Sequence, residues 1–156
     1  MSPDEIQQAQ TLMSNGELQA LYDLLRPFIE QNEPNALLFY SSFTLDDWNE
    51  SDEVFMQRSF SNLQQASKAG LAEASYQLAA HYLYGEDTFD LQQATHYFEN
   101  AIEQHHPLAE FTYGYSLYYG LNGLTADQER GLRLLKSASS QGVEGADDVL
   151  ADIKAS

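Results

Sequence analysis

A residue suited to positive φ is followed four positions later by an alanine at four places in this 156-residue chain. The four pairs are Asn32 and Ala36, Gly70 and Ala74, His105 and Ala109, and Gly142 and Ala146. Successive alanines are separated by 38, 35 and 37 residues. Stacked helical hairpins repeat with periods of about 33 to 47 residues, so the spacing predicts a fold built from helical repeats.

Two segments in the middle of the chain show the repeat most clearly. Residues 74–85 read ASYQLAAHYLYG and residues 109–120 read AEFTYGYSLYYG, with a small residue at the first, sixth and last position of each. A small residue lets a second helix approach closely, whereas a helical glycine costs about 1 kcal/mol relative to alanine. We therefore expect Gly114 to lie at a tight helix contact. The segments 94–101 and 131–138 are also alike, so each unit is predicted to be a two-helix hairpin.

Apolar periodicity and capping residues predict nine helices. Their expected ranges are 3–14, 17–31, 34–45, 52–69, 71–84, 90–104, 107–120, 127–141 and 144–153. Ser2 and Pro3 form a favourable helix start, and Pro27 is expected to bend or interrupt the second helix. The predicted fold class is all-α, a right-handed α-solenoid of about four helical hairpins plus a C-terminal capping helix.

The chain is expected to form a single domain over residues 1–156, a length that can bury a sizeable core. The expected parts are divergent N-terminal hairpins over 2–70, the best-formed repeats over 71–142 and a C-terminal cap over 143–156. The capping helix carries Asp147, Asp148 and Asp152 beside Val149, Leu150 and Ile153. One face can seal the end of the stack while the acidic face stays solvated; the alternative is that the acidic face is a binding surface.

Acidic residues dominate the charge of the chain. There are 24 acidic and 7 basic residues, and the segment 69–129 contains nine acidic residues but no lysine or arginine. Nucleic-acid affinity depends on cations that neutralise phosphates, so nucleic-acid binding is not expected. The negative electrostatic field of the acidic residues would attract a basic protein partner. The alternative is that the net charge of −17 only keeps the protein soluble.

The densest acidic cluster precedes the fourth predicted helix. Its members are Asp46, Asp47, Glu50, Asp52 and Glu53. Ser51 is a favourable N-cap residue, and acidic side chains in the first turn interact well with the positive end of a helix. Part of this cluster is therefore expected to cap the helix that follows.

The repeated frame resembles the Sel-one-like repeat family, a relative of the tetratricopeptide repeats. The matching positions are Ala74, Leu78-Ala79, Tyr82, Gly85, Asp90, Ala94, Tyr97-Phe98, Ala101 and His105 in one repeat, and Ala109, Tyr113-Gly114, Leu117, Gly120, Asp127, Leu135, Ala138 and Gly142 in the next. Ala79 and His105 stand where the family pattern has glycine, and the loop 121–126 is longer than its counterpart. The resemblance implies an α-solenoid that binds protein partners rather than an enzyme.

Aromatic residues supply the candidate binding site. By analogy with tetratricopeptide-type stacks, the first helix of each hairpin lines a concave surface that holds partners. The predicted protein-binding residues are Tyr76, Tyr84, Phe111, Tyr115, Tyr118, Tyr119, Glu73 and Glu110. Tyrosine combines a large apolar body with a hydroxyl and is enriched in interfaces. The alternative is packing between hairpins, which is expected for Leu78, Tyr82, Tyr113 and Leu117.

The chain has no cysteine, which excludes disulfides and thiolate metal sites. The first residues show no basic stretch followed by an apolar core, and no segment approaches about 18 consecutive apolar residues. Neither a signal peptide nor membrane insertion is expected, and a cytoplasmic location is predicted.

The histidines are the first residues to test for catalysis or metal binding. They are His81, His96, His105 and His106. His105 occupies a positive-φ position of the repeat, which histidine tolerates better than most residues. His81 and His96 lie on different predicted helices without metal-ligand spacing, and the carboxylates of segment 86–90 surround a loop rather than a cleft. Nucleotide-binding and nucleophile motifs are absent, so no catalytic, cofactor or metal site is expected.

The sequence predicts a non-catalytic adaptor or regulator that binds a partner protein in an aromatic groove, whose acidic rim selects a basic partner surface. Electrostatic complementarity also allows a more specific function, an immunity protein that masks the positive active site of a secreted toxin. A hydrolase or metalloenzyme is the alternative from another class, which the metal content of the purified protein would test. The identity of the partner and the oligomeric state do not follow from the sequence.

Overall fold

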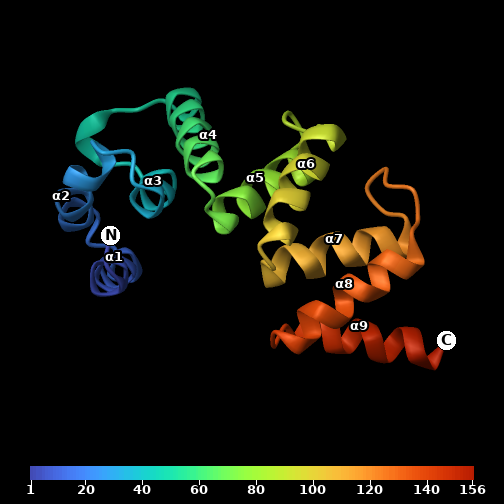
Figure 1. Ribbon diagram of the computed structural model, residues 1–156. Coiled ribbons are helices and arrows are strands. Elements are labelled where there is room, and N and C mark those ends of the chain that lie inside the picture. The colour runs from blue at the N-terminus through green and yellow to red at the C-terminus, as the bar shows by residue number, and fades with distance from the viewer. The chain divides into compact units, whose positions relative to one another are not determined.

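The computed structural model describes all 156 residues, and every regular element in it is helical (Figure 1). The elements are α1 (Pro3–Asn15), α2 (Leu18–Ile29), α3 (Pro34–Tyr40), the 3₁₀ helix η1 (Asp46–Trp48), α4 (Asp52–Lys68), α5 (Ala72–Tyr84), α6 (Leu91–Glu103), α7 (Pro107–Tyr119), α8 (Gln128–Ser140) and α9 (Glu144–Ala155). The prediction of nine α-helices is confirmed. None of them combines the length and hydropathy that a membrane crossing requires.

The residues predicted to adopt positive φ do so at all four corners of the repeat. Asn32 has φ of 54°, His105 has 56°, Gly70 has 96° and Gly142 has 88°. The residue after each of them donates its N–H to the carbonyl five positions earlier, as in the bond from His106 N to Ala101 O at 3.1 Å. This bond is the signature of a Schellman helix end. The corner chemistry of the repeat is therefore local and explains His105 without a catalytic role.

The chain divides into two compact units, Met1–Ala74 and Ser75–Ser156, called here the N-terminal unit and the C-terminal unit. In the N-terminal unit, a capping box starts α1: Glu5 N donates to Ser2 Oγ at 3.2 Å, and Ser2 N donates to Glu5 Oε2 at 2.6 Å. A core from α1, α2 and α3 and from the segment that follows α3 contains Ala9, Leu21, Leu25, Ala36 and Phe43. This core packs α1, α2 and α3 against one another.

Two helix predictions in the N-terminal unit need correction. Helix α2 is not interrupted at Pro27 and continues to Ile29. Helix α3 ends at Tyr40 instead of near residue 45. The hydroxyls of Ser41 and Ser42 donate to carbonyls of the last turn of α3, and Phe43 enters the core. These contacts replace a further turn of helix.

Arg58 of α4 holds the segment between α3 and α4 in place. Its guanidinium donates to both carboxylate oxygens of Glu50, each at 2.7 Å, and to the carbonyls of Tyr40 and Phe43 at 2.6 and 2.9 Å. It also lies 4.3 Å from the centroid of the Tyr40 ring and 5.3 Å from that of Trp48. Glu50 is thus an internal partner of Arg58. The expected N-cap of α4 is confirmed, because Ser51 Oγ accepts from Val54 N at 3.3 Å.

The acidic Glu50 side chain makes the stability of this unit dependent on pH. The hydrogen bonds from Arg58 are the main cause that lowers the pKa of Glu50, to about 2 from an ordinary value of 4.5. Because the Glu50 carboxylate has the higher pKa in the unfolded chain, it binds a proton more readily there. The stabilisation that the Glu50–Arg58 pair gives the folded state is therefore complete above pH 4.5 and is lost as the pH falls towards 2. We expect the difference in unfolding free energy between the parent and Glu50→Gln to shrink over this window by roughly 2 kcal/mol. Urea unfolding at several pH values measures it, and a constant difference would contradict the prediction.

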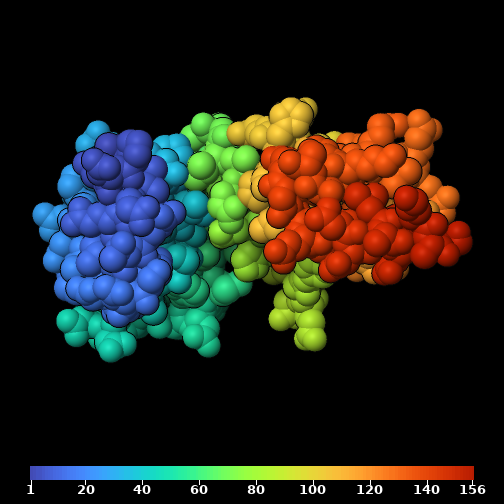
Figure 2. Space-filling model, turned by 90° about the horizontal axis from the view of Figure 1, so that it is seen from below, coloured from blue at the N-terminus to red at the C-terminus, as the bar shows by residue number.

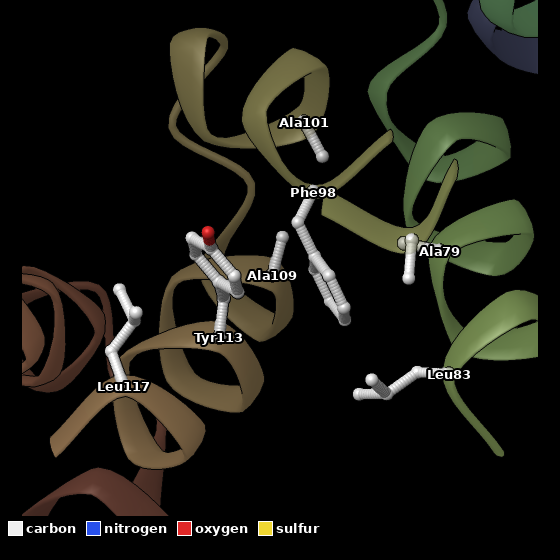
Figure 3. Packing of buried hydrophobic residues seen from close by; sticks show 8 residues of the cluster. Ala79, Leu83, Phe98, Ala101, Ala109, Tyr113 and Leu117 are labelled. Carbon is white, nitrogen blue, oxygen red and sulfur yellow. The ribbon is translucent and has the colours of Figure 1, made fainter. Parts of the chain in front are cut away.

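The C-terminal unit is built around aromatic and small residues of α5, α6 and α7 (Figure 3). Phe98 points from α6 towards Ala109 and Tyr113 of α7, and its ring stacks on that of Tyr113 with centroids 5.2 Å apart. Ala79 and Leu83 close the cluster from α5. The packing role expected for Leu78, Tyr113 and Leu117 is confirmed, since all three are buried, and Tyr82 packs partly buried against the same cluster.

Helices α7 and α8 meet through a pair of glycines. A Cβ on Gly114 would lie 2.8 Å from Leu134 Cβ and 3.1 Å from Gly131 O. A Cβ on Gly131 would lie 2.6 Å from Tyr118 N and 2.7 Å from Gly114 O. The tight contact predicted at Gly114 is confirmed. Helix α8 in turn packs against α9, and Figure 2 shows the two side by side in orange and red.

Candidate protein-binding surface

Three successive turns of α7 present aromatic rings on one side of the helix. Phe111, Tyr115 and Tyr119 are spaced four residues apart, and their ring centroids are 6.4 and 5.0 Å apart in succession. Tyr118 contacts Tyr119 edge-on at 4.9 Å. Tyr115 is 38% exposed and Tyr119 is 45% exposed. These four residues are called the α7 aromatic row, and they form a continuous surface that is partly open to solvent.

Helix α9 packs beside this row. A Cβ on Gly145 would lie 3.0 Å from Phe111 Cζ, so the start of α9 lies against the start of α7. The two helices run in the same direction (Figure 1). Asp148 and Asp152 follow Gly145 by three and seven residues and therefore share its face of α9. Both are exposed, which places carboxylates along the flank of the α7 aromatic row.

The electrostatics of Tyr119 support this arrangement. Partial burial, the neighbouring rings of Tyr115 and Tyr118, and the negative charge of Asp152 together raise the pKa of Tyr119. A ring with a carboxylate beside it is an arrangement that attracts a cationic group.

The predicted residues of α5 form a separate part of the surface. The ring of Tyr76 stacks on that of His106 with centroids 4.9 Å apart, so Tyr76 is half-buried. Tyr84 is 59% exposed, and burial together with Tyr76 raises its pKa. A shallow depression of about 510 Å³ lies over Tyr76, Ala80 and Tyr84. No ring contact joins these tyrosines to the α7 aromatic row.

The two predicted acidic residues have different surroundings. Glu73 is half-buried in the first turn of α5. Glu110 is only 2% exposed, accepts a hydrogen bond from Gln141 Nε2 at 2.7 Å and lies 3.4 Å from His105 Nδ1. Its carboxylate connects the α6–α7 corner to the end of α8 and is not available at the surface. The acidic residues beside the row are instead Asp148 and Asp152.

The sequence contained a signal for these two aspartates. The register of the repeat aligns Ala146 with Ala109, so Asp148 and Asp152 occupy the positions of Phe111 and Tyr115 in the preceding hairpin. Their exposure agrees with the solvated face expected for the capping helix. The repeat register adds that they lie on the same side of the stack as the aromatic residues of α7.

The histidines have contacts that account for some of their positions. His106 caps α7 by accepting a hydrogen bond from Ala109 N at 3.2 Å, and His96 lies 3.4 Å from the amide of Asn100. No three His, Cys, Asp or Glu side chains are grouped so that they could hold a metal ion. The surface with exposed aromatic rings is thus the best-defined candidate site.

Comparison with known proteins agrees with the repeat frame. The family model described as the Sel1 (Sel-one) repeat matches residues 72–106 and 107–143. A crystal structure of a Sel1 repeat protein from Oxalobacter formigenes matches with a TM-score of 0.69 and 22% sequence identity over 85% of this chain. The match spans 38% of the length of that protein. A comparison with curated proteins gives no match.

Sel1 repeat proteins generally mediate protein–protein interactions and are typically non-catalytic scaffolds. Two consecutive repeats match in the segment where the register of small residues is clearest. The structural match extends the similarity in fold over most of the chain. The chain therefore carries two consecutive segments that match the Sel1 repeat, and its fold is an α-solenoid of the tetratricopeptide type.

Proposed function

We propose that this protein is a non-catalytic adaptor or regulator that binds a partner protein through the α7 aromatic row. The observation that carries the proposal is the exposure of Tyr115 and Tyr119, whose rings lie against each other instead of entering the core. A half-exposed tyrosine pair offers apolar area and hydroxyl groups with little loss of rotamer freedom on binding. The depression beside Tyr76 and Tyr84 offers a second aromatic contact on the same unit.

The charge of the surroundings favours a basic partner surface. Segment 69–129 contributes no lysine or arginine, and α9 contributes Asp148 and Asp152 beside the row. Opposite charges accelerate association and suppress wrong partners. Because these carboxylates are exposed, the attraction should weaken as salt is added. Binding is thus proposed to combine aromatic anchors with a salt-sensitive acidic flank.

Replacing Tyr115 and Tyr119 together with alanine is expected to abolish partner capture while the helical circular-dichroism signal stays close to that of the parent. The two rings are partly exposed, so their loss removes contact area for a partner but little of the core. The measurement is a pull-down from lysate of the native organism at low and high ionic strength, with proteins identified by mass spectrometry.

Phe89→Ala is the matched control, because Phe89 is 54% exposed and belongs to neither aromatic group. The control should retain every salt-sensitive partner that the parent captures. Retention of those partners by the double tyrosine variant would contradict the proposal. Loss of the helical signal in that variant would assign the tyrosines to the core instead.

A further inference from the structure

The protein binds two of its own arginines with the same pair of groups, an aromatic ring and a carboxylate. The guanidinium of Arg58 lies over Tyr40 and donates two hydrogen bonds to Glu50. The guanidinium of Arg130 lies 5.5 Å from the centroid of Tyr113 and donates to both oxygens of Glu99, at 2.7 and 2.6 Å. A planar guanidinium suits both contacts, because its faces stack on rings while its edge pairs with a carboxylate.

A third pairing of rings and carboxylate lies at the surface without an arginine. Tyr115 and Tyr119 have ring centroids 5.0 Å apart at an angle of 61°. Asp152 lies two turns after Gly145 on the face of α9 that contacts Phe111 of α7, which places its carboxylate beside these rings. The two remaining arginines of the chain pair with other carboxylates, Arg26 with Glu30 and Arg133 with Glu129. None of the ion pairs of the chain involves Asp152.

Helix α9 separates its charges between its faces. Asp152 lies on the face shared with Gly145, next to α7. Lys154 lies two residues further on, which turns it about 200° around the helix, and together with Lys136 it borders a depression between α8 and α9. The negative face towards the tyrosines is therefore not neutralised by Lys154, the one cation of α9.

We propose that Tyr115, Tyr119 and Asp152 bind the side chain of an arginine presented by the partner protein, the guanidinium stacking on the tyrosine rings and donating hydrogen bonds to the Asp152 carboxylate. This inference rests on the proposed function and names the chemistry of the partner group. Arginine fits better than lysine, because a guanidinium is planar and more weakly hydrated than an ammonium group. Citrulline has nearly the same shape without the positive charge and should not bind.

The test is an NMR titration of the full chain, with labelled tyrosine rings, against arginine blocked at both ends as N-acetyl-arginine methylamide. We expect saturable shifts of the Tyr115 and Tyr119 ring signals, weaker shifts with the lysine analogue and none with the citrulline analogue. Asp152→Asn should weaken the arginine affinity about fivefold, in line with an exposed charge-assisted hydrogen bond. Asp87→Asn, an exposed site in the α5–α6 loop with the same change in net charge, should leave it unchanged.

Shifts at other residues only, equal shifts with citrulline, or equal affinity of the Asp152→Asn and parent proteins would overturn the inference. The proposed function is judged separately by the pull-down. If the double tyrosine variant loses its partners while blocked arginine fails to bind, the binding surface stands and the arginine chemistry is wrong. If blocked arginine binds at the tyrosines but partner capture survives their removal, the arginine site stands and the proposed function is wrong.

Discussion

Replacing Arg58 with methionine is expected to destabilise the N-terminal unit by about 3 to 5 kcal/mol, the cost of removing one partner of a largely buried ion pair. The side chains of Arg58 and Glu50 are only 14% and 13% exposed. Methionine fills similar volume but leaves the Glu50 carboxylate and the carbonyls of Tyr40 and Phe43 without their donor. Trp48, the single tryptophan, lies beside the guanidinium, so its fluorescence during urea unfolding reports the loss directly.

Arg26→Met is the matched control for this substitution. Arg26 pairs with Glu30 at 3.8 Å on the surface of α2, with side chains 65% and 71% exposed. An exposed pair of this kind contributes at most about 1 kcal/mol. Equal losses for the two variants would show that Arg58 is only another surface charge. Arg58→Lys should fall between them, because it keeps the charge but loses the forked donor geometry.

The contacts of Arg58 could not be predicted from the sequence. Helix ends were readable because their determinants are local: an Asn, Gly or His at positive φ fixes a corner within a few residues. The role of Arg58 depends on contacts with Glu50, eight residues away, and with Tyr40, eighteen residues away. In the sequence Glu50 belonged to an acidic cluster, and nothing in the spacing singled it out as an internal partner. The early end of α3 combines local hydrogen bonds of Ser41 and Ser42 with the distant donors of Arg58 to the carbonyls of Tyr40 and Phe43.

The candidate site was predictable in part. The register of the repeat distinguished Tyr113, which packs inside, from Tyr115 two residues later, which is partly exposed, because the two lie on different sides of α7. The burial of Glu110 could not be predicted from the sequence, because it depends on a hydrogen bond from Gln141, which lies 31 residues later at the end of α8. Asp152 could be aligned with the tyrosine positions, but its proximity to Tyr119 follows only once α9 is packed beside α7.

Gly131→Ala is expected to destabilise the C-terminal unit by about 2 to 3 kcal/mol, although alanine is the better helix former by about 1 kcal/mol. The added Cβ would meet backbone atoms, Tyr118 N at 2.6 Å and Gly114 O at 2.7 Å, and backbone cannot rotate aside as a side chain can. Helices α7 and α8 must therefore separate. Eight of the ten tyrosines belong to this unit, so thermal unfolding followed by near-ultraviolet circular dichroism measures the effect.

Alanine substitutions at two other glycines serve as controls, because they distinguish the clash with backbone at Gly131 from the general effect of replacing a glycine. Gly142→Ala meets no atom within 4 Å but requires alanine at φ of 88°, so it should cost only about 1 kcal/mol. Gly145→Ala meets the Phe111 ring at 3.0 Å, which can turn, and should be milder than Gly131→Ala. A Gly131→Ala protein as stable as the parent would show that the two helices can move apart freely. If they separate as expected, Tyr118 shifts with the backbone of α7, and partner capture by the α7 aromatic row should fall together with stability.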